Sequence, residues 1–540
     1  MLLINPNDLK DYEIEANAAG YTFDQMMAEA GNGLADIIDS KWQDETDRSI
    51  LGLIGGGKNG ADALIGLTKL GRLGWNTSAV RITQASIPDW VIEGYEKSGG
   101  KVLSQPDKHH LADILKDFAF ILDGVIGTGF TPPMREELAG VMTFIKSHCT
   151  GKRIIAVDCP SGVDCLTGSV ENATMHATLT VCMEGVKTGL MKFPAFEFAG
   201  EIKVVDVGVL KKIHKISEIH SFLIDTDMVA NVLPVRNAYS HKGTYGVVLV
   251  CGGSVNYPGA PLFTARSAYR VGAGMVKSAV PERIYDITAS QCPESTWILL
   301  DDENGVICDK ADKVVRYEMG KATCLAIGPG LGLEETTFRF VKGILTTGDS
   351  SERNNSVGFL QGALNNEKEE EKTCPAVIDA DALRLLARIP DWSNKLRQKI
   401  VLTPHPGEMS SLTGLSIDDI EKNRVEICQH YVKEWQQVIV LKGPLTVIAS
   451  PEGYTAINPI ACSALAKAGS GDVLTGIIAG LIAQGSALFE AALAGVWIHG
   501  MAGVLAAEKL QVEESVGIAE ILAGIPDAIR LVTKKKPLVI

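Results

Sequence analysis

Short apolar segments rich in β-branched residues alternate with helix-like segments along most of the chain, and this alternation constrains the fold more than any other feature. It is the pattern of βαβ units, in which parallel strands form a sheet that helices cover on both faces. The chain also has 540 residues, too many for one ordinary core. We therefore predict an α/β protein of two domains.

The positions of the strands and helices follow from these apolar segments. In the first part of the chain we predict helices over Leu9–Ala19 and Thr22–Asp39, and strands over Ile50–Ile54, Ser78–Ile82, Ala119–Leu122, Arg153–Val157, Thr178–Cys182 and Ile202–Val205. In the second part we predict strands over Val247–Val250, Met275–Ala279, Cys324–Ile327, Ala376–Ile378, Ile400–Leu402 and Val438–Leu441. The apolar stretch Val473–Ala483 is too short to span a bilayer, so we predict a buried helix.

Two polar stretches interrupt the alternation. Residues 211–221, KKIHKISEIHS, have the weakest periodicity and are the predicted linker between the domains. Residues 346–373 contain GDSSERNNS and NNEKEEEK, which predict an exposed insertion within the second domain.

Charge and cysteine content exclude several classes of protein. The net charge of -14 argues against a general nucleic-acid binder. The N-terminus is acidic by Asp8 without a long apolar run, so we expect neither a signal peptide nor a membrane partner. The 11 cysteines include no CxxC pair, which favours reduced thiols in the cytoplasm. A bridge between Cys159 and Cys165 is the less favoured alternative.

The segment AKAGSGDVLTG, residues 466–476, carries the clearest chemical signal. Small residues end at Asp472 and an apolar helix follows, so unpaired N–H groups and the partial positive charge of a helix N-terminus would face an anion. Asp472 could then act as a general base toward an attacking hydroxyl. The alternative is that Asp472 only caps the helix.

Other loops follow predicted strands and would meet at the same sheet edge. Lys442, Gly443 and Thr446 could lie along the phosphates of a nucleotide, or LKGPLTV could be a plain hairpin. In TPHPGEM two prolines hold His405 stiffly, which suggests a ligand contact more than a structural role. The segments IGPGLG and VIDADAL also lie at strand ends.

Taken in order, GPGLG, VIDADAL, LTPHPGEM, LKG..T and AGSGDVLTG resemble the ADP- or ATP-dependent NAD(P)H-hydrate dehydratases, which have the ribokinase-like fold. The resemblance covers roughly residues 225–535 and implies a dehydratase domain over 225–540. It implies that the hydrated nicotinamide nucleotide binds near Ala260, Gly330, His405 and Asp472. It implies that the adenine nucleotide contacts Lys442, Gly443, Pro444, Leu445, Thr446 and Gly471.

The chemistry implied by this resemblance is a phosphorylation followed by an elimination. Asp472 would deprotonate the hydroxyl on carbon 6 of the hydrated ring, the nucleotide would phosphorylate it, and phosphate would leave with help from the ring nitrogen. A magnesium ion is expected with the nucleotide because it neutralises phosphate charge. The sequence leaves ADP and ATP open as donors, with a weak preference for ADP.

Three segments of the first part also join strands to turns. The loop IGGGKNGADAL could bind phosphate at a helix N-terminus. LDGVIGTGF and VDCPSGVD each place an aspartate at a strand end, where it could face a shared crevice or merely cap the next turn.

These three segments and Glu29-Ala-Gly resemble the NAD(P)H-hydrate epimerases, a Rossmann-like, doubly wound domain, over residues 1–215. The resemblance implies Asp158 as the acid or base and a potassium ion held by Asn59, Asp123 and Ser161. It implies that the substrate contacts Asp158 together with Lys58, Asn59, Gly60, Ala61, Asp62, Gly127, Thr128, Gly129, Phe130, Thr131, Pro132 and Pro133.

The glycine-rich loop departs from the family pattern Asn-Asn-Gly-Gly-Asp-Gly, because Lys58, Ala61 and Ala63 replace an asparagine and two glycines. Lys58 could pair with a substrate phosphate, or the changes could weaken epimerase activity. The fused arrangement has a stereochemical logic, since hydration gives two epimers and the dehydratase uses only the S form.

Two rival functions remain at this point. The anion site and Asp472 alone would equally suit a sugar or vitamin kinase of the same fold, and the first domain could be a non-catalytic binding or assembly module. By the resemblance we expect NAD(P)H hydrates and ADP or ATP as small-molecule partners, and a homo-oligomer.

Overall fold

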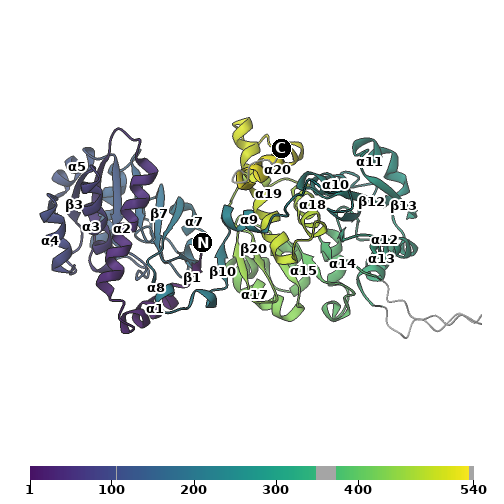
Figure 1. Ribbon diagram of the computed structural model, residues 1–540, viewed down its shortest axis with the longest axis horizontal. Helices are drawn as coiled ribbons and strands as arrows, with labels where there is room; N and C mark the ends of the chain where they lie inside the picture. Colours follow the sequence, from purple (N-terminus) through teal and green to yellow (C-terminus); the bar gives the residue numbers. More distant parts are fainter. Residues whose placement is uncertain (105, 348–371, 534–540) are drawn as a thin grey trace, which may run out of the picture. The chain divides into compact units, whose positions relative to one another are not determined.

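The computed structural model of the chain describes residues 1–104, 106–347 and 372–533, and divides them into two compact units (Figure 1). The first unit is Met1–Leu223 and the second begins at Ile224. The predicted linker at 211–221 contains the end of one helix, a 3-10 turn and the start of a strand. Most of the predicted polar insertion, 346–373, lies outside the described residues.

The first unit is built on one parallel sheet. Its strands lie in the order β4 (Val102–Ser104), β3 (Asn76–Arg81), β2 (Ser49–Ile54), β5 (Phe120–Gly124), β6 (Arg153–Val157), β7 (Leu179–Met183) and β9 (Glu201–Val205). A small parallel pair joins β1 (Leu3–Ile4) to β8 (Val186–Lys187), and β10 (Ser221–Leu223) ends the unit.

Helices cover both faces of this sheet, as the alternation of side chains along β2 requires. Ile50 and Ile54 pack on one side with α2 and α3, and Leu51 and Leu53 pack on the other with α5 and α6. The helices are α1 (Pro6–Ala18), α2 (Phe23–Trp42), α3 (Gly57–Arg72), α4 (Asp89–Lys97), α5 (Lys108–Lys116), α6 (Glu136–His148), α7 (Ala195–Ala199) and α8 (Val209–Lys212), with 3-10 turns η1 (Thr188–Met191) and η2 (Ile216–Glu218).

The second unit contains a longer mixed sheet. Its strands lie in the order β21 (Thr455–Ile457), β20 (Val447–Ala449), β19 (Val438–Leu441), β18 (Ile400–Leu402), β17 (Ala376–Ile378), β16 (Cys324–Ile327), β11 (Val247–Cys251), β12 (Met275–Pro281) and β13 (Thr296–Leu300). The strands from β19 to β13 are parallel, and β20 and β21 turn back antiparallel. A hairpin of β14 (Asp302–Glu303) and β15 (Val306–Ile307) follows β13.

One face of this sheet supports the site helices. On it, α9 (Thr226–Val232), α10 (Gly259–Val271), α18 (Ser470–Ala483), α19 (Leu488–Leu510) and α20 (Ile518–Thr533) share a core with sheet residues such as Val250 and Val401. The predicted helix at Val473–Ala483 is therefore confirmed as buried. The remaining helices are α11 (Tyr285–Gln291), α12 (Asp312–Met319), α13 (Glu335–Leu345), α14 (Asp381–Ala387), α15 (Pro406–Thr413), α16 (Ile417–Lys422) and α17 (Arg424–Trp435), with 3-10 turns η3 (Glu282–Ile284), η4 (Asp309–Ala311), η5 (Trp392–Lys395) and η6 (Ser463–Leu465).

Three further observations bear on the sequence expectations. The α/β fold class is confirmed, and all eleven cysteines, which lie among the described residues, are free thiols.

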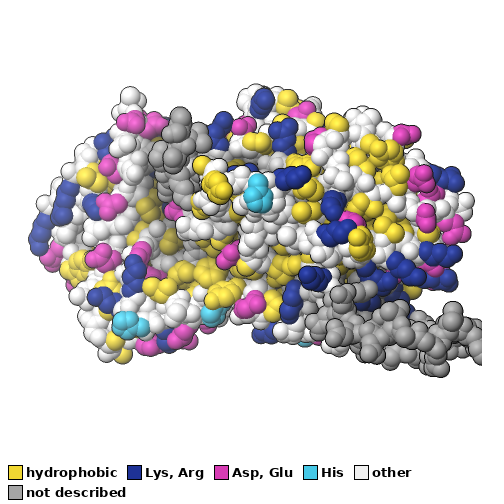
Figure 2. Space-filling model, turned by 45° about the vertical axis from the view of Figure 1, so that its right-hand side comes forward, with side chains coloured by type: hydrophobic (Ala, Val, Ile, Leu, Met, Phe, Trp, Pro, Cys, Tyr) yellow, Lys and Arg dark blue, Asp and Glu magenta, His cyan; other side chains and the backbone are white. Residues whose placement is uncertain are grey.

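Among the described residues, α19 is the one helix long and apolar enough to cross a membrane, but 67% of its most apolar window is buried inside the protein. On the face in Figure 2, acidic and basic side chains are interspersed with hydrophobic ones.

Candidate active sites

The first candidate site is a cavity of about 810 Å³ in the second unit, where the loops after β17, β18 and β19 meet the N-terminus of α18. Asp379 follows β17, His405 follows β18 and Lys442 follows β19, while Asp472 comes from the first turn of α18. The carboxyl ends of adjacent parallel strands lie at one edge of a sheet, so side chains far apart in sequence converge here.

The first turn of α18 is open toward this cavity. Gly469 is the N-cap residue, with φ of 95° and no side-chain cap, so the interpretation of Asp472 as the cap is wrong. The backbone N–H groups of Gly471 and Asp472 lie in the turn that has no partners within the helix. The carbonyl oxygen of Asp472 accepts a hydrogen bond from Thr264 Oγ1 at 3.1 Å, which fixes this turn against α10.

Asp379 is the centre of a buried polar network at the cavity wall. Its Oδ1 accepts hydrogen bonds from Lys442 Nζ at 2.7 Å and from Thr403 Oγ1 at 2.8 Å. Its Oδ2 accepts one from Thr475 Oγ1 at 2.7 Å. Burial alone would raise the pKa of Asp379, but Lys442 and these hydrogen bonds outweigh it and hold that pKa below its usual value. Asp379 therefore stays ionised and fixes the ammonium of Lys442.

The segment from Lys442 to Thr446 is both a hairpin turn and part of the cavity wall, so both interpretations of its sequence describe part of its structure. Leu441 pairs with Val447 in an antiparallel hairpin, and Lys442, Gly443, Pro444 and Thr446 line the cavity. Arg424 holds the turn by donating to the carbonyl oxygens of Leu441 and Lys442 at 2.8 and 3.0 Å. Leu445 is buried and does not line the cavity, so only its neighbours are placed to touch a nucleotide there.

His405 begins α15, where its imidazole replaces the usual capping side chain. Its Nδ1 accepts hydrogen bonds from the N–H groups of Gly407 at 3.0 Å and Glu408 at 3.3 Å. Glu408 Oε2 in turn accepts from the His405 N–H at 2.8 Å, which completes a capping box. Burial and the charge of Lys442 lower the pKa of His405, so the ring is neutral and carries its proton on Nε2.

Two carboxyl groups at this cavity have raised pKa values. Burial, reinforced by the charge of Asp379, raises the pKa of Asp472 to about 8. Burial likewise raises the pKa of Glu408 to about 7, although Lys442 Nζ lies 3.7 Å from its Oε2. Groups with such values can accept and return protons near neutral pH.

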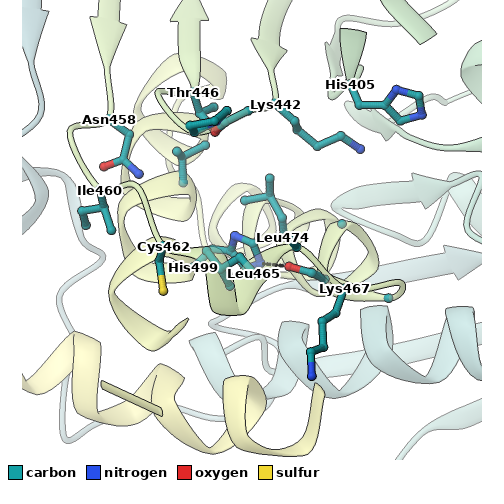
Figure 3. Close-up of a pocket in the computed structure, with 18 of the residues that line it drawn as sticks. His405, Lys442, Thr446, Asn458, Ile460, Cys462, Leu465, Lys467, Leu474 and His499 are labelled. Carbon is teal, nitrogen blue, oxygen red and sulfur yellow. Dashed lines mark hydrogen bonds between the residues drawn. The ribbon is translucent and has the colours of Figure 1, made fainter. Parts of the chain in front are cut away.

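The far end of the cavity is mostly apolar. Figure 3 shows Ile460, Leu465 and Leu474 around it, with Lys442 and Thr446 on the opposite wall. His499 lies there with Nε2 2.9 Å from Ser470 Oγ, and burial lowers the pKa of His499 to about 4. A cavity with apolar side chains at one end and Lys442 at the other suits a nucleotide, whose base is flat and whose phosphates are charged.

Ala260 and Gly330 do not line this cavity. They are neighbours, because a Cβ added to Gly330 would lie 3.0 Å from that of Ala260. Thr264 Oγ1 lies 3.2 Å from the carbonyl oxygen of Ala260 and 3.1 Å from that of Asp472. A substrate that touches Ala260 and Gly330 would therefore approach the Asp472 turn from the side of α10.

The second candidate site lies in the first unit, where the glycine-rich loop opens α3. A Cβ at Gly60 would lie 2.2 Å from the carbonyl oxygen of Gly55, so only glycine fits this turn. A Cβ at Gly127 would lie 3.0 Å from Asn59 Oδ1, which places the Asn59 amide against the segment 127–133. The Nδ2 of Asn59 is buried without a hydrogen-bond partner among the described residues, so it is free for a ligand.

The residues that replace family glycines do not occlude this loop. Ala61 and Ala63 are fully buried in the core on one face of the sheet. Lys58 is half-exposed and pairs with Glu13 at 2.5 Å, with its ammonium 4.3 Å from the Phe23 ring. Lys58 is thus already paired with Glu13 of α1. The expected pairing of Lys58 with a substrate phosphate would require this ion pair to break.

Asp123 and Ser161 form one buried pair. Asp123 Oδ1 accepts from Ser161 Oγ at 2.6 Å, and Oδ2 accepts from the Ser161 N–H at 2.9 Å. Ser161 Oγ also accepts from the Ile126 N–H at 2.9 Å, next to the turn that Asn59 contacts. Asp123 makes only a 3.4 Å contact with the Val125 N–H, so capping is a minor part of its role.

Asp158 is held by a buried lysine that sequence reasoning missed. Its Oδ1 accepts from the Met183 N–H at 2.9 Å and forms an ion pair with Lys187, whose side chain is fully buried. The carboxylate of Asp158 therefore does not cap the following turn, and Oδ2 is the oxygen available to a substrate. Burial and the charge of Asp158 raise the pKa of the neighbouring Asp62 carboxyl well above its usual value.

The residues expected to hold potassium fit that ion chemically. Asn59 Oδ1, the Asp123 carboxylate and Ser161 supply hard oxygen donors around the turn at 124–127, as a monovalent cation prefers. The described residues of both units contain no group of three or more His, Cys, Asp or Glu side chains arranged as a metal site. A magnesium ion in the second unit would therefore be held mainly by the phosphates of a nucleotide.

Sequence reasoning also missed Asp379, Glu408 and Thr475. All three lie inside motifs that it had singled out, VIDADAL, TPHPGEM and AGSGDVLTG. The signal that could have found Asp379 is its position directly after a strand, in the first of two aspartates. Glu408 is the third helical residue after His405, where a capping box expects a glutamate.

Comparisons with known proteins identify the family of the chain. A family profile described as NAD(P)H-hydrate dehydratase matches residues 248–526, and one described as YjeF-related protein N-terminus matches residues 23–189. The chain is 35% identical over 497 residues to a Bifunctional NAD(P)H-hydrate repair enzyme Nnr of Moorella thermoacetica, covering 90% of this chain and 88% of the relative. A relative of the same name from Dictyoglomus turgidum is 33% identical and is covered over 89% of each chain.

A solved structure is also similar to the second unit. It is an ADP/ATP-dependent NAD(P)H-hydrate dehydratase from Bacillus subtilis, co-crystallized with ATP/Mg²⁺, with 29% identity and a TM-score of 0.46. The match covers 58% of this chain and 98% of that one. From the two profiles and the full-length relatives, the chain belongs to the family of bifunctional NAD(P)H-hydrate repair enzymes.

Proposed function

We propose that the second unit removes water from the S epimer of hydrated NAD(P)H with ADP or ATP as phosphate donor, and that the first unit interconverts the R and S epimers. The observation that carries the first half is the convergence of Lys442, the open first turn of α18 and the poised carboxyl of Asp472 at one cavity. A vitamin or sugar kinase shares the first two features, but the family to which the chain belongs favours the dehydratase.

In the second unit, Asp472 takes the proton from the hydroxyl on carbon 6 as that oxygen attacks the terminal phosphate. Lys442, fixed by Asp379, and the N–H groups of Gly471 and Asp472 stabilise the charge that develops on the transferring phosphoryl group. The phosphorylated hydroxyl is a far better leaving group than hydroxide. Magnesium, when bound with the nucleotide, would neutralise phosphate charge.

In the first unit, Asp158 acts on the hydrated ring through Oδ2, because Oδ1 is tied to Lys187 and Met183. Asn59 and the segment 127–133 contact the nucleotide substrate, and Asn59, Asp123 and Ser161 hold potassium. The inward packing of Ala61 and Ala63 supports an active epimerase, because neither methyl group enters the loop. Free thiols support the cytoplasm as the compartment. ADP as the preferred donor and a homo-oligomeric state stay predictions.

The direct test of the dehydratase is Asp472→Asn with S-NADH hydrate, ADP and Mg²⁺. We expect NADH formation, followed by its absorbance, to fall at least about 100-fold, because a general base contributes that much. Release of free phosphate should fall with it. A stable phosphoester product without NADH would instead identify a kinase.

The control for this variant is Asp418→Asn, the same change at an exposed residue that pairs with Lys422. It should keep wild-type turnover.

Thermal unfolding checks the fold of Asp472→Asn. The raised pKa of Asp472 means that ionising this carboxyl costs stability as pH rises from about 4 to about 8, so the variant should unfold at no lower temperature than wild type at pH 8. Near-wild-type NADH formation by Asp472→Asn would refute the assignment.

A further inference from the structure

The dehydration requires two proton acceptors, although only one is assigned so far; this inference rests on the proposed function of the second unit. Loss of water from the hydrated ring removes the hydroxyl from carbon 6 and a hydrogen from carbon 5. The first acceptor takes the hydroxyl proton during phosphorylation. When phosphate then leaves, the ring becomes a cation across nitrogen 1 and carbon 6. A second acceptor must remove a proton from carbon 5 to give the double bond of NAD(P)H.

The two aspartates at the cavity are unsuited to this second step. Asp472 already carries the hydroxyl proton when phosphate departs. Both oxygens of Asp379 accept hydrogen bonds, from Lys442, Thr403 and Thr475, and its pKa lies below the usual value despite its burial. A carboxylate held in this way is a weak base.

The two histidines at the cavity are also unsuited to accept the proton from carbon 5. His405 uses the lone pair of Nδ1 to accept the N–H groups of Gly407 and Glu408, so in the neutral ring Nε2 carries the proton and has no lone pair to offer. His499 is hydrogen-bonded to Ser470, and its pKa of about 4 makes it a poor base. Neither imidazole can take a proton from carbon 5 in this arrangement.

Two glutamates at the cavity remain, Glu513 and Glu408. Glu513 is exposed and accepts a hydrogen bond from Ser463 Oγ, whereas Glu408 is buried and lies beside Lys442. Glu408 is therefore the better placed of the two. It lines the cavity between the loops that carry His405 and Lys442. Its Oε2 accepts the His405 N–H at 2.8 Å and lies 3.7 Å from Lys442 Nζ, and its Oε1 lies 3.3 Å from His405 Nε2. These contacts hold the carboxyl group in one orientation on the same wall as Lys442. Burial raises its pKa to about 7, which suits a group that accepts a proton near neutral pH.

We propose that Glu408 is the second base, which removes the proton from carbon 5 after phosphate has left carbon 6. The C5–H bond breaks, and its electron pair forms the double bond between carbons 5 and 6 and neutralises nitrogen 1. The proton moves to the Glu408 carboxylate and returns to solvent after the product leaves. No oxidant or further reactant is needed, because the overall change is loss of one water with transfer of one phosphate.

Glu408→Gln tests this step because it keeps the size of the side chain and an oxygen that can accept the His405 N–H. The variant is incubated with S-NADH hydrate, ADP and Mg²⁺, and free phosphate and NADH are measured together. We expect NADH formation to fall about 100-fold. Phosphate release should fall less, because water can add back to the ring cation. The ratio of phosphate to NADH, which is one in wild type, should therefore rise, with hydrate of both epimers regenerated.

A deuterated substrate gives an independent readout. Hydrating NADH in D₂O places deuterium on carbon 5, and this substrate should slow NADH formation more in Glu408→Gln than in wild type while phosphate release is unchanged. Glu434→Gln, the same change at an exposed residue of α17, is the matched control and should keep a ratio of one.

Two results would overturn the role of Glu408. One is a ratio of one with near-wild-type NADH formation, which would assign the proton to the departing phosphate. The other is an equal fall of both products without an added isotope effect, which would make Glu408 a positioning residue for His405 and Lys442. Both leave the proposed dehydratase intact, because phosphate and NADH are still made by wild type. Failure of wild type to make either product would instead refute the proposed function, and this inference with it.

Discussion

At the scale of single residues, the ion pair between Lys442 and Asp379 distinguishes Asp379 from the two other carboxyl groups discussed at the cavity, those of Asp472 and Glu408. Lys442 is committed to Asp379 at 2.7 Å, whereas burial raises the pKa of Asp472 to about 8 and that of Glu408 to about 7. Asp379 thus stays ionised beside Lys442, whereas Asp472 and Glu408 bind their protons more tightly. This separation is what permits one residue to hold a cation while the others move protons.

The pKa of Asp472 gives a pH dependence with a definite sign. A general base must be ionised, so kcat/KM for dehydration should rise with pH and level off above about 8. Glu408 adds to the loss of activity as pH falls through about 7. Initial rates of NADH formation between pH 6 and 9.5 at low hydrate concentration measure this profile. A profile that stays flat from pH 6 to 9 would contradict the role of Asp472 as base.

Much of this residue-scale account could be predicted from sequence, but not all of it. His405 and Lys442 stand in glycine- and proline-rich loops after apolar strands, and Asp472 follows a glycine-rich segment at the start of an apolar helix. The structure brings these three to one cavity. Asp379 and Lys187 could not be assigned, because their importance lies in ion pairs with Lys442 and Asp158, which are distant in sequence. Leu445 was expected at the nucleotide, but it is buried in the turn between β19 and β20 and does not line the cavity.

At the scale of elements, the site is held in place by the close packing of α18 on α10. A Cβ added to Gly476 of α18 would lie 2.0 Å from Ser267 Oγ and 2.1 Å from the carbonyl oxygen of Thr264. Thr264 is also the residue that bonds the carbonyl oxygen of Asp472. Gly476 therefore helps the two helices approach closely enough to fix the turn that carries Asp472.

Gly476→Ala should separate these helices. We expect a loss of about 1–3 kcal/mol in stability from overpacking, and lower dehydratase activity because the Thr264 contact to the Asp472 turn is stretched. Thermal unfolding and NADH formation measure the two effects. Gly140→Ala is the control, since no atom lies within 4 Å of a Cβ at this position of α6, and it should leave stability unchanged or slightly higher. A Gly476→Ala variant as stable and active as wild type would show that the packing is not needed.

The burial of each strand explains much of which strands could be predicted from the sequence. Buried central strands such as β16, β17, β18 and β19 were predicted at their observed bounds, because a strand covered on both faces is a continuous apolar run. Edge strands such as β4 and β13 were not predicted. β4 has three residues, too few to show a pattern, whereas β13 reads TWILL and is an apolar run that the prediction missed.

At the scale of the whole molecule, the chain joins two α/β units whose proposed activities are consecutive. The first unit has a Rossmann-like sheet with Asp123 and Asp158 at its strand ends and Asn59 in the first turn of α3, and the second has the proposed phosphate-binding turn of α18. Fold alone would not distinguish a repair enzyme from a kinase with an attached binding module. The combination of both domain families over nearly the full chain is what favours repair of both epimers.

The central claim, that the two units together repair both epimers, is tested most directly by supplying mixed R- and S-NADH hydrate with ADP or ATP and Mg²⁺ and following NADH absorbance. We expect wild type to convert the whole mixture to NADH, and Asp472→Asn to convert almost none. Asp158→Asn should convert the S fraction quickly and the rest only as fast as the hydrate epimerises by itself. The account would be contradicted if Asp158→Asn recovered both epimers at the wild-type rate, or if wild type accumulated a phosphoester without NADH.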